Sequence, residues 1–539
     1  MFNLYRKKWV AIGFVLCLFN VVYAYSDGNG TPAEPYQIAS VSDWNDLMKT
    51  SSDWNKYFIM TADIDLQGIT LAPVGNSSKN FTGVFDGNDH VIRNADINRP
   101  ASDYIGLFGY VGSGGQIRDL GVEDVNMTGN DGVGGLVGYN YGTIADCYVT
   151  GAVGGGYEVG GLVGRNYGNL TACYAASVVT GSVNLVGGLV GCNYGNLTTC
   201  YATGVVTGSG NYVGGLVGYN WKSDTYPATI TDCYSTGTVI GSGNYVGGLV
   251  GRTSGTIIDC RAAGAVIGGS NSQNVGGLVG MHWYGTIDTC YATGGVSCGS
   301  SSRNVGGLVG VNYSDFYGGI TRGIISDSYS TGAVTGGSYV GGLAGYMENG
   351  SASSCYSMGA VVGDSNVGGL VGYSGDGSIS ISGCYFLITS GPDNGLGTPL
   401  TDGQMKQQSS FVGWDFTTPV WKICNHTNYP KLAWQELLAG DFVCPDGVDF
   451  YDFAVLAKQW TLEKLSEDIA PGTGDGTINF IDWAVTADGW QGDMNELADF
   501  TSQWLRLSAY CADIAPAGGD GVVDTLDFVA FAENWLEGT

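Results

Sequence analysis

The phrase Val-Gly-Gly-Leu occurs nine times in this 539-residue chain, with its second glycine at positions 135, 161, 188, 215, 248, 277, 307, 342 and 369. Neighbouring copies are 26 to 35 residues apart, and "IGLFGY" at 105–110 looks like a degenerate tenth copy. A unit of this length cannot bury a hydrophobic core alone, so neighbouring copies have to stack. The repeat therefore predicts a stack of coils, each formed by one copy.

Between the phrases, residues alternate with a period of two. In "CYATGVVTG" (200–208), every second residue from Cys200 to Val206 is small and apolar. The residues between them, from Tyr201 to Thr207, are larger or polar. This alternation, rich in β-branched residues, predicts strands with the first set inside and the second outside. We expect the paired glycines to permit tight corners. Two or three short strands per coil give a mainly β protein, a β-solenoid of about ten coils and about 50 Å in length.

Composition and charge narrow the class of protein. Hydrophobic residues make up 44% of the chain, which excludes a disordered glycine-rich linker, and no Gly-X-Y triplet indicates collagen. The net charge of −28 argues against a nucleic-acid partner. Arg6 to Lys8 precede an apolar run that ends near Val22-Tyr23-Ala24, so residues 1–24 read as a signal peptide. No other stretch could span a membrane, and we expect a secreted or cell-surface protein.

The chain divides into regions of different pattern. Residues 36–104 precede the regular repeat and are expected to cap the solenoid, with a short helix at 40–50. The repeats occupy 105–385, and 386–434 are expected to form a second cap. Residues 441–539 are a separate acidic domain with 19 Asp and Glu but 3 Lys and Arg.

If the coils stack in register, two positions of the repeat form columns of side chains. A cysteine recurs in eight coils, from Cys147 to Cys384, and Ser328 replaces it once. We interpret it as core filler, with disulfides or metal ligation as the alternatives. A tyrosine follows it in most coils and should form an outward stripe, which either stabilises the sheet or binds sugar rings. The candidate binding residues in this stripe are Tyr174, Tyr201 and Tyr234.

The corner after "GLVGYN" is a second candidate ligand site. Aromatic residues recur there, and two long insertions, 221–228 and 312–324, lie close to it. Insertions on one edge of a solenoid often mark a binding face, although tolerated loop variation would leave the same pattern. The aromatic residues are Tyr141, Tyr167, Tyr194, Trp221, Trp283, Tyr284 and Tyr313.

No catalytic residue can be assigned from the sequence. The three histidines are scattered, and no nucleophile or zinc-protease motif occurs. Asp146, Asp232 and Asp259 precede the repeat cysteine and could line a glycosidase-like groove, or form a polar strand face.

The acidic domain contains three loop-and-helix patterns that suit Ca²⁺. Calcium loops place several oxygen ligands around a glycine turn and close with a carboxylate. Two loops match at their later positions, whereas Pro471 and Pro516 stand where a first ligand would be. The alternative is a helical domain with acidic caps. The candidate ligands are Asp441, Asp449 and Asp452, then Asp475, Asn479 and Asp482, and finally Asp520, Asp524 and Asp527.

These motifs resemble two known families. "VGGLVG" followed by Cys-Tyr and Gly is similar to the GLUG repeat of bacterial exported proteins, over roughly residues 36–434. That resemblance implies a right-handed parallel β-helix at or outside the cell surface. It implies no single activity, since such repeats accompany adhesins and some secreted peptidases. The 441–539 domain resembles a dockerin module, which implies a cohesin-like partner.

The sequence therefore leads to three hypotheses. In the first, a secreted, non-catalytic solenoid binds polysaccharide or a cell surface and attaches through a calcium-dependent module. In the second, the β-helix is a polysaccharide-degrading hydrolase or lyase. In the third, the protein is purely structural surface material.

Overall fold

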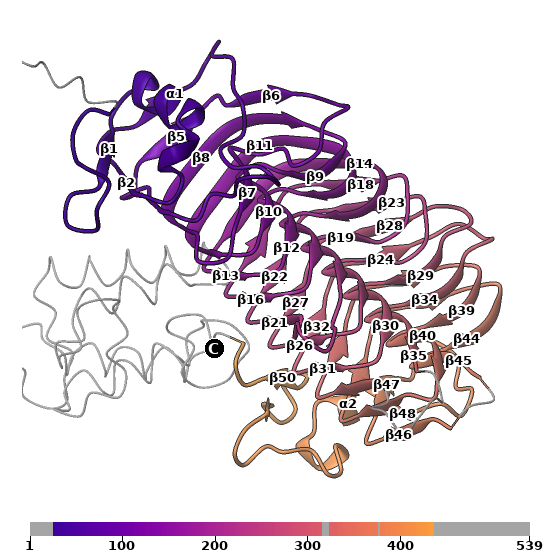
Figure 1. Ribbon diagram of the computed structural model, residues 1–539. Helices are drawn as coiled ribbons and strands as arrows, with labels where there is room; N and C mark the ends of the chain where they lie inside the picture. The colour runs from indigo at the N-terminus through magenta and orange to yellow at the C-terminus, as the bar shows by residue number, and fades with distance from the viewer. Residues whose placement is uncertain (1–24, 315–322, 376–377, 436–539) are drawn as a thin grey trace, which may run out of the picture.

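The computed structural model describes residues 25–314, 323–375 and 378–435, which form a parallel β-solenoid of about 12 turns (Figure 1). About ten coils were expected. The number is higher because β1 (Tyr36–Ile38), β2 (Tyr57–Met60) and β4 (Val84–Asp86) pair in parallel with one another and with β8 (Gln116–Thr128). The strands β1, β2 and β4 lie in the 36–104 segment and extend the stack without carrying the repeated phrase.

Each regular coil contributes one strand to a ten-stranded parallel sheet. Its members are β7 (Phe108–Val111), β10 (Val137–Asn140), β12 (Val163–Asn166), β15 (Val190–Asn193), β20 (Val217–Asn220), β25 (Val250–Thr253), β30 (Val279–Trp283), β35 (Val309–Tyr313), β40 (Ala344–Glu348) and β45 (Val371–Ser374).

The remaining strands of the coils form a 38-stranded sheet. Between β15 and β20, one coil runs through β16 (Asn196–Thr198), β17 (Tyr201–Ala202), β18 (Val206–Gly208) and β19 (Val213–Gly214). Each strand pairs in parallel with its counterpart in the next coil. The column through β16 also holds β11 (Thr143–Gly160), β13 (Asn169–Thr171), β21 (Thr229–Thr231), β26 (Thr256–Ile258), β31 (Thr286–Asp288), β36 (Ile324–Ser326), β41 (Ser351–Ser353) and β46 (Ser380–Ser382). The column through β17 holds β14 (Tyr174–Gly187), β22 (Tyr234–Ser235), β27 (Arg261–Ala262), β32 (Tyr291–Ala292), β37 (Tyr329–Ser330), β42 (Tyr356–Ser357) and β47 (Tyr385–Leu387).

Two further columns and a few terminal strands complete the sheet. The column through β18 holds β23 (Val239–Gly241), β28 (Val266–Gly268), β33 (Val296–Ser297), β38 (Val334–Thr335) and β43 (Val361–Val362). The column through β19 holds β24 (Val246–Gly247), β29 (Gln273–Gly276), β34 (Arg303–Gly306), β39 (Ser338–Gly341) and β44 (Ser365–Gly368). The terminal strands are β3 (Ile64–Asp65), β5 (Val91–Arg93), β6 (Asp96–Asn98), β9 (Asp131–Gly134) and β48 (Thr398–Leu400).

The interior is a continuous column of small and branched apolar side chains. Cys200 and Val206 are fully buried, whereas Tyr201 is half-buried, so the predicted alternation is confirmed for this coil. The repeat cysteines are free buried thiols, as expected for core filler. Each thiol donates a hydrogen bond to the carbonyl two residues earlier, as Cys200 does to Thr198 at 3.2 Å. The hydroxyl of Ser328 makes the same bond to Ser326 at 2.6 Å, which explains how serine replaces cysteine there.

The paired glycines stand at the corner between the two sheets, as expected, but the physical reason is not a left-handed φ. Neither Gly187 nor Gly188 has a left-handed φ. A Cβ on Gly188 would lie only 2.1 Å from the carbonyl oxygen of Gly215 in the next coil. The glycines are therefore required because stacked backbones touch at this corner, and conformational freedom is not the reason.

Non-glycine residues take the left-handed conformation at two other corners of the coil. One is the position before the cysteine, as in Asp146 (φ 52°) and Thr199 (φ 54°). The other is the position before the repeated Val-Gly-Gly, as in Leu185 (φ 65°) and Tyr212 (φ 63°). Aspartate tolerates this conformation better than most residues, which accounts for its recurrence before the cysteine.

Buried asparagines connect successive coils at the end of the ten-stranded sheet. The side-chain amide of Asn140 donates to Asn166, that of Asn166 to Asn193, and that of Asn193 to Asn220, at 2.7 to 2.8 Å. Asn140 Oδ1 also accepts the backbone N–H of Gly142, which closes the predicted Asn-x-Gly turn. We call Asn140, Asn166, Asn193 and Asn220 the asparagine ladder; it fixes the corner that follows.

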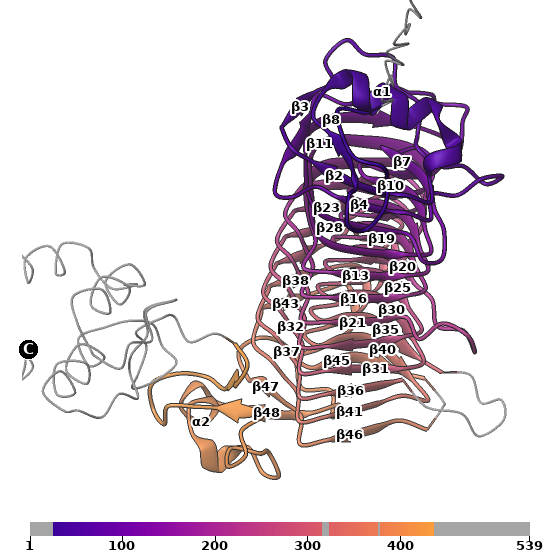
Figure 2. The same ribbon diagram turned by 60° about the vertical axis from the view of Figure 1, so that its left-hand side comes forward.

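A helical segment covers the N-terminal end of the solenoid, whereas the 400–434 segment lies beside the last coils, against their outward tyrosines (Figure 2). At the N-terminal end lie α1 (Val41–Lys49), close to the expected helix, and η1 (Ser51–Asp53). Beside the last coils lie α2 (Asp402–Met405), η2 (Gln408–Ser410) and an antiparallel pair, β49 (Trp421–Lys422) with β50 (Lys431–Leu432). No helix of the described residues has the length and apolar character needed to cross a bilayer.

Candidate functional site

A row of aromatic rings lies at the corner after the asparagine ladder. The backbone N–H groups of Tyr167, Tyr194 and Trp221 each donate to the carbonyl of a ladder asparagine in the preceding coil, at 2.7 to 2.8 Å. Because these coils make this turn in the same way, their rings stack on one another. The centroids of Tyr141 and Tyr167 are 4.4 Å apart, and those of Tyr167 and Tyr194 are 4.5 Å apart, with planes inclined by about 10°.

Further rings extend and cover this row. Tyr110 stacks on Tyr141 at 5.4 Å, and Trp221 stacks on Tyr194 at 6.0 Å. Tyr226, from the 221–228 insertion, leans against Tyr167 at 5.1 Å. The exposed fraction of Trp221 is 45%, and the tyrosines are half-buried. We call Tyr110, Tyr141, Tyr167, Tyr194, Trp221 and Tyr226 the corner ladder.

The other three predicted corner aromatics lie further along the solenoid. Ser254 stands at the ladder position between Trp221 and Trp283 and interrupts the series of rings. Trp283 is paired in register with Tyr313, and its ring lies 5.1 Å from that of Tyr284.

The predicted tyrosine stripe is present, and only part of it is open. Rings in adjacent coils stack nearly parallel, with Tyr174 4.7 Å from Tyr201 and Tyr201 4.7 Å from Tyr234. Arg261 continues the column with its guanidinium 4.3 Å above the ring of Tyr234. Beyond that point, Tyr329, Tyr356 and Tyr385 are buried beneath residues of the 400–434 segment, such as Trp421. The open part thus comprises Tyr148 and the three predicted binding residues.

Sequence reasoning missed a third aromatic group, on the outer face of the ten-stranded sheet. Tyr219 occupies the variable position of Val-Gly-x-Asn, and Tyr212 and Tyr245 precede the repeated Val-Gly-Gly. Tyr212 stacks on Tyr219 at 5.4 Å and on Tyr245 at 4.9 Å. The guanidinium of Arg252 lies 4.2 Å from the ring of Trp283. The recurrence of tyrosine at these two repeat positions was the signal that could have identified the group.

One charged cluster lies on this face. The hydroxyl of Tyr139 donates to Glu158 at 2.8 Å, and Arg165 forms an ion pair with the same carboxylate. Burial, together with the charge of Glu158, raises the pKa of Asp131 to about 6. Glu158 is 2% exposed, and its two carboxylate oxygens bond to Tyr139 and Arg165. The carboxylate of Glu158 is therefore not free to act in hydrolysis.

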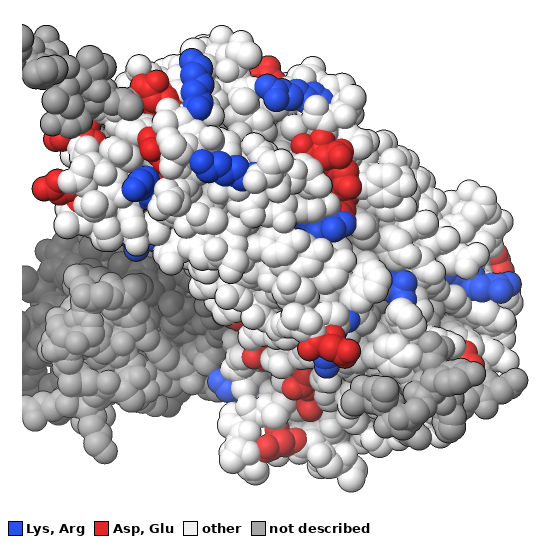
Figure 3. All heavy atoms as spheres, in the orientation of Figure 1, with Lys and Arg blue, Asp and Glu red and all other residues white. Residues whose placement is uncertain are grey.

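The other acidic candidates lie at corners of the coils. Asp146, Asp232 and Asp259 occupy left-handed corners, with φ of 52° to 53°. Figure 3 shows few charged side chains over the middle of the solenoid on the face that carries β12 and β30. The predicted calcium ligands, in 441–539, lie outside the described residues, as does the predicted signal peptide.

Known proteins are similar to parts of this chain. The model of the GLUG motif matches residues 129–154, 182–207, 209–240, 242–267, 271–297 and 301–335. Halomucin of Haloquadratum walsbyi is 36% identical over 140 residues, which are 24% of this chain and 2% of halomucin. A "Putative Gly-rich membrane protein" of Evansella cellulosilytica is 33% identical over 150 residues, which are 24% of this chain and 17% of that protein. The chain thus spans a small part of either relative.

Among solved structures, a "putative immunoglobulin A1 protease" from Bacteroides ovatus aligns with 77% of this chain and 96% of its own, at 20% identity and a TM-score of 0.33. The six matched segments all lie in the coils from β9 to β38. The chain therefore carries GLUG repeats, and these repeats build a parallel β-solenoid.

Proposed function

We propose that this protein is a secreted or cell-surface solenoid that binds polysaccharide along the corner ladder without cleaving it. The corner ladder supports this proposal because it is a continuous aromatic surface that is partly open to solvent. Tyrosine and tryptophan combine a large apolar face with a polar edge. The C–H face of a sugar ring can pack on the apolar face of such a side chain, and the hydroxyls of the sugar can hydrogen-bond to its polar edge.

Two observations support a location outside the cytoplasm. The first 24 residues have the pattern of a signal peptide. The names of the two relatives, halomucin and a Gly-rich membrane protein, agree with a protein at the cell surface.

We further propose that residues 441–539 bind Ca²⁺ and attach the solenoid to a cohesin-like partner. The sequence pattern of three glycine turns with following carboxylates supports this part. Calcium titration of the full chain should show uptake that is lost when Asp475, Asp482, Asp520 and Asp527 are replaced by alanine. Unchanged calcium uptake and partner attachment after removal of 441–539 would exclude the attachment role.

A purely structural role is the second candidate. The buried end of the tyrosine stripe favours it, because Tyr329 and Tyr356 stack at 4.8 Å and serve there to hold the 400–434 segment. In this part of the molecule, the stacked tyrosines therefore have a structural role.

The proposed binding is tested with the full chain and insoluble polysaccharides. Replacing Trp221 and Tyr226 by alanine should weaken retention about 5- to 150-fold, since two ring contacts of about 0.5–1.5 kcal/mol each are lost. Tyr157→Ala is the matched control, because Tyr157 is 43% exposed and lies outside the corner ladder. Equal retention of both variants would refute the ladder as the site, and released sugar products would refute the non-catalytic proposal.

A further inference from the structure

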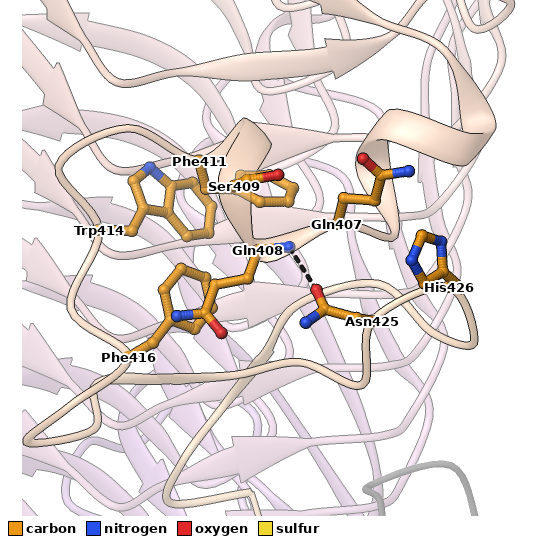
Figure 4. A pocket seen from close by; sticks show the side chains of 8 residues that line it. All are labelled: Gln407, Gln408, Ser409, Phe411, Trp414, Phe416, Asn425 and His426. Carbon is orange, nitrogen blue, oxygen red and sulfur yellow. Dashed lines mark hydrogen bonds between the residues drawn. The ribbon is translucent and has the colours of Figure 1, made fainter.

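The C-terminal segment of the described chain contains a pocket that no sequence pattern indicated. Its volume is about 460 Å³, within the range of small-molecule sites. It lies in the 400–434 segment, away from the corner ladder. Its lining residues are Gln407, Gln408, Ser409, Phe411, Trp414, Phe416, Asn425 and His426 (Figure 4).

The two sides of the pocket differ in chemistry. Phe411, Trp414 and Phe416 form an aromatic side, on which the planes of Trp414 and Phe416 are inclined by 17°. Gln407, Asn425 and His426 lie on the opposite side and supply amide and imidazole groups. None of the eight lining residues is Asp, Glu, Lys or Arg. The pocket thus offers an apolar surface facing amide and imidazole groups.

The aromatic side is held firmly by the solenoid. The indole N–H of Trp414 donates to the carbonyl of Gly383 at 2.8 Å, and its ring lies 4.3 Å from that of Trp421. Phe411 packs edge-on against Tyr385 at 5.3 Å. Phe416 is the aromatic residue that remains partly open. A ligand would meet a wall that is already ordered, which reduces the entropy lost on binding.

The polar side is also oriented. The backbone N–H of Gln408 donates to Asn425 Oδ1 at 2.7 Å, which fixes the amide and directs its two N–H donors away from that bond. The backbone N–H of His426 donates to the carbonyl of Lys406 at 2.6 Å. The side chains of Gln408, Asn425 and His426 are exposed and can be replaced without opening the core.

We propose that this pocket binds a neutral sugar residue of a polysaccharide. A pyranose has an apolar C–H face for the aromatic wall and hydroxyl groups that exchange hydrogen bonds with amides. A uronate or a phosphate would bring a negative charge, and the lining contains no Lys or Arg to pair with it. A wholly apolar ligand would leave the amide groups unpaired. This second site is separate from the corner ladder and does not depend on it.

The test uses the full chain with Trp221 and Tyr226 already replaced by alanine, so that binding at the corner ladder is weakened. Calorimetric titration with cellotetraose, mannotetraose and xylotetraose should show binding to at least one. Phe416→Ala and Asn425→Ala should each weaken that binding about fivefold, by loss of one ring contact or one hydrogen bond. Val412→Ala, on the same loop and with a 76% exposed side chain, should change nothing.

Three outcomes would overturn the proposal. They are no binding of any neutral tetrasaccharide, binding that neither Phe416→Ala nor Asn425→Ala alters, and equal or tighter binding of tetragalacturonate as an anionic probe. Unfolding midpoints of the variants verify that the loop remains folded. Because no residue of this pocket belongs to the corner ladder, failure here leaves the corner-ladder proposal intact, and failure of that proposal leaves this pocket intact.

Discussion

Gly188 is confined by the next coil of the solenoid. Its Cα faces the backbone of Gly215, and a Cβ would also lie 2.9 Å from the Cβ of Ala202 in its own coil. The same close approach recurs at the second glycine of most coils, for example 2.0 Å at Gly277. Backbone atoms cannot rotate away as a side chain can, so the spacing between coils itself excludes any larger residue here.

Replacing Gly188 by alanine should therefore destabilise the solenoid by roughly 3 kcal/mol or more, because the coils must separate locally to admit one methyl group. Gly154→Ala is the matched control. A Cβ at Gly154 has only Thr180 O nearby, at 3.8 Å, and its φ is not left-handed. Thermal unfolding midpoints should fall for the first variant and stay or rise slightly for the second. Similar midpoints would show that steric contact does not explain why glycine recurs at this position of the repeat.

At the scale of the element, the asparagine ladder connects sequence to the candidate site. Each asparagine is buried and joins its own turn to the next coil. In the coil after Asn220, a threonine, Thr253, occupies the position of the ladder asparagine. Its hydroxyl accepts from Asn220 at 3.2 Å and from the backbone N–H of Gly255 at 3.1 Å. Threonine thus keeps the two acceptor functions of the position.

Asn193→Ala should cost about 2–4 kcal/mol, because it removes one hydrogen bond from each of the buried amides of Asn166 and Asn220. It should also disorder the ring of Tyr194, whose corner the ladder fixes. Asn193→Thr should cost less, since the chain already uses threonine at Thr253. Thermal unfolding reports the stability, and near-ultraviolet circular dichroism reports the ordering of stacked tyrosines. An alanine variant as stable as the threonine variant would contradict this role.

The sequence could predict what repeats in every coil. The inward Cys200, the outward Tyr201 and the corner rings of Tyr167 and Tyr194 follow from local alternation and in-register stacking. Alternation of the same kind could not reveal the buried state of Tyr356, since its hydroxyl donates to the carbonyl of Pro430, 74 residues later. Such burial depends on a segment that has no repeat pattern.

Two other features escaped prediction for related physical reasons. The additional turns were missed because strands such as β2 stack by backbone hydrogen bonds, which need no repeated side chains. The pocket around Trp414 was missed because its lining comes from turns whose relative placement no periodicity encodes.

At the scale of the whole molecule, each coil contacts mainly its neighbours, and a different non-repeat segment packs near each end. Stability in such an array is approximately a sum of coil and interface contributions, so a local change acts locally. At the N-terminal end, Trp44 of α1 packs edge-on against Phe85 and Phe108. At the C-terminal end, Trp421 is fully buried against the tyrosine stripe.

Trp421→Ala should loosen only the C-terminal coils. It removes a buried indole, at a cost of about 3–5 kcal/mol, and deprives Asp327 of the N–H that donates to it at 2.9 Å. Hydrogen exchange of the full chain should accelerate in β37 and β42 and remain unchanged in β10 and β12. Trp44→Ala is the matched variant and should give the opposite pattern, with faster exchange near β4 and β7. Uniform acceleration along the chain in either variant would show that the solenoid unfolds as one cooperative unit.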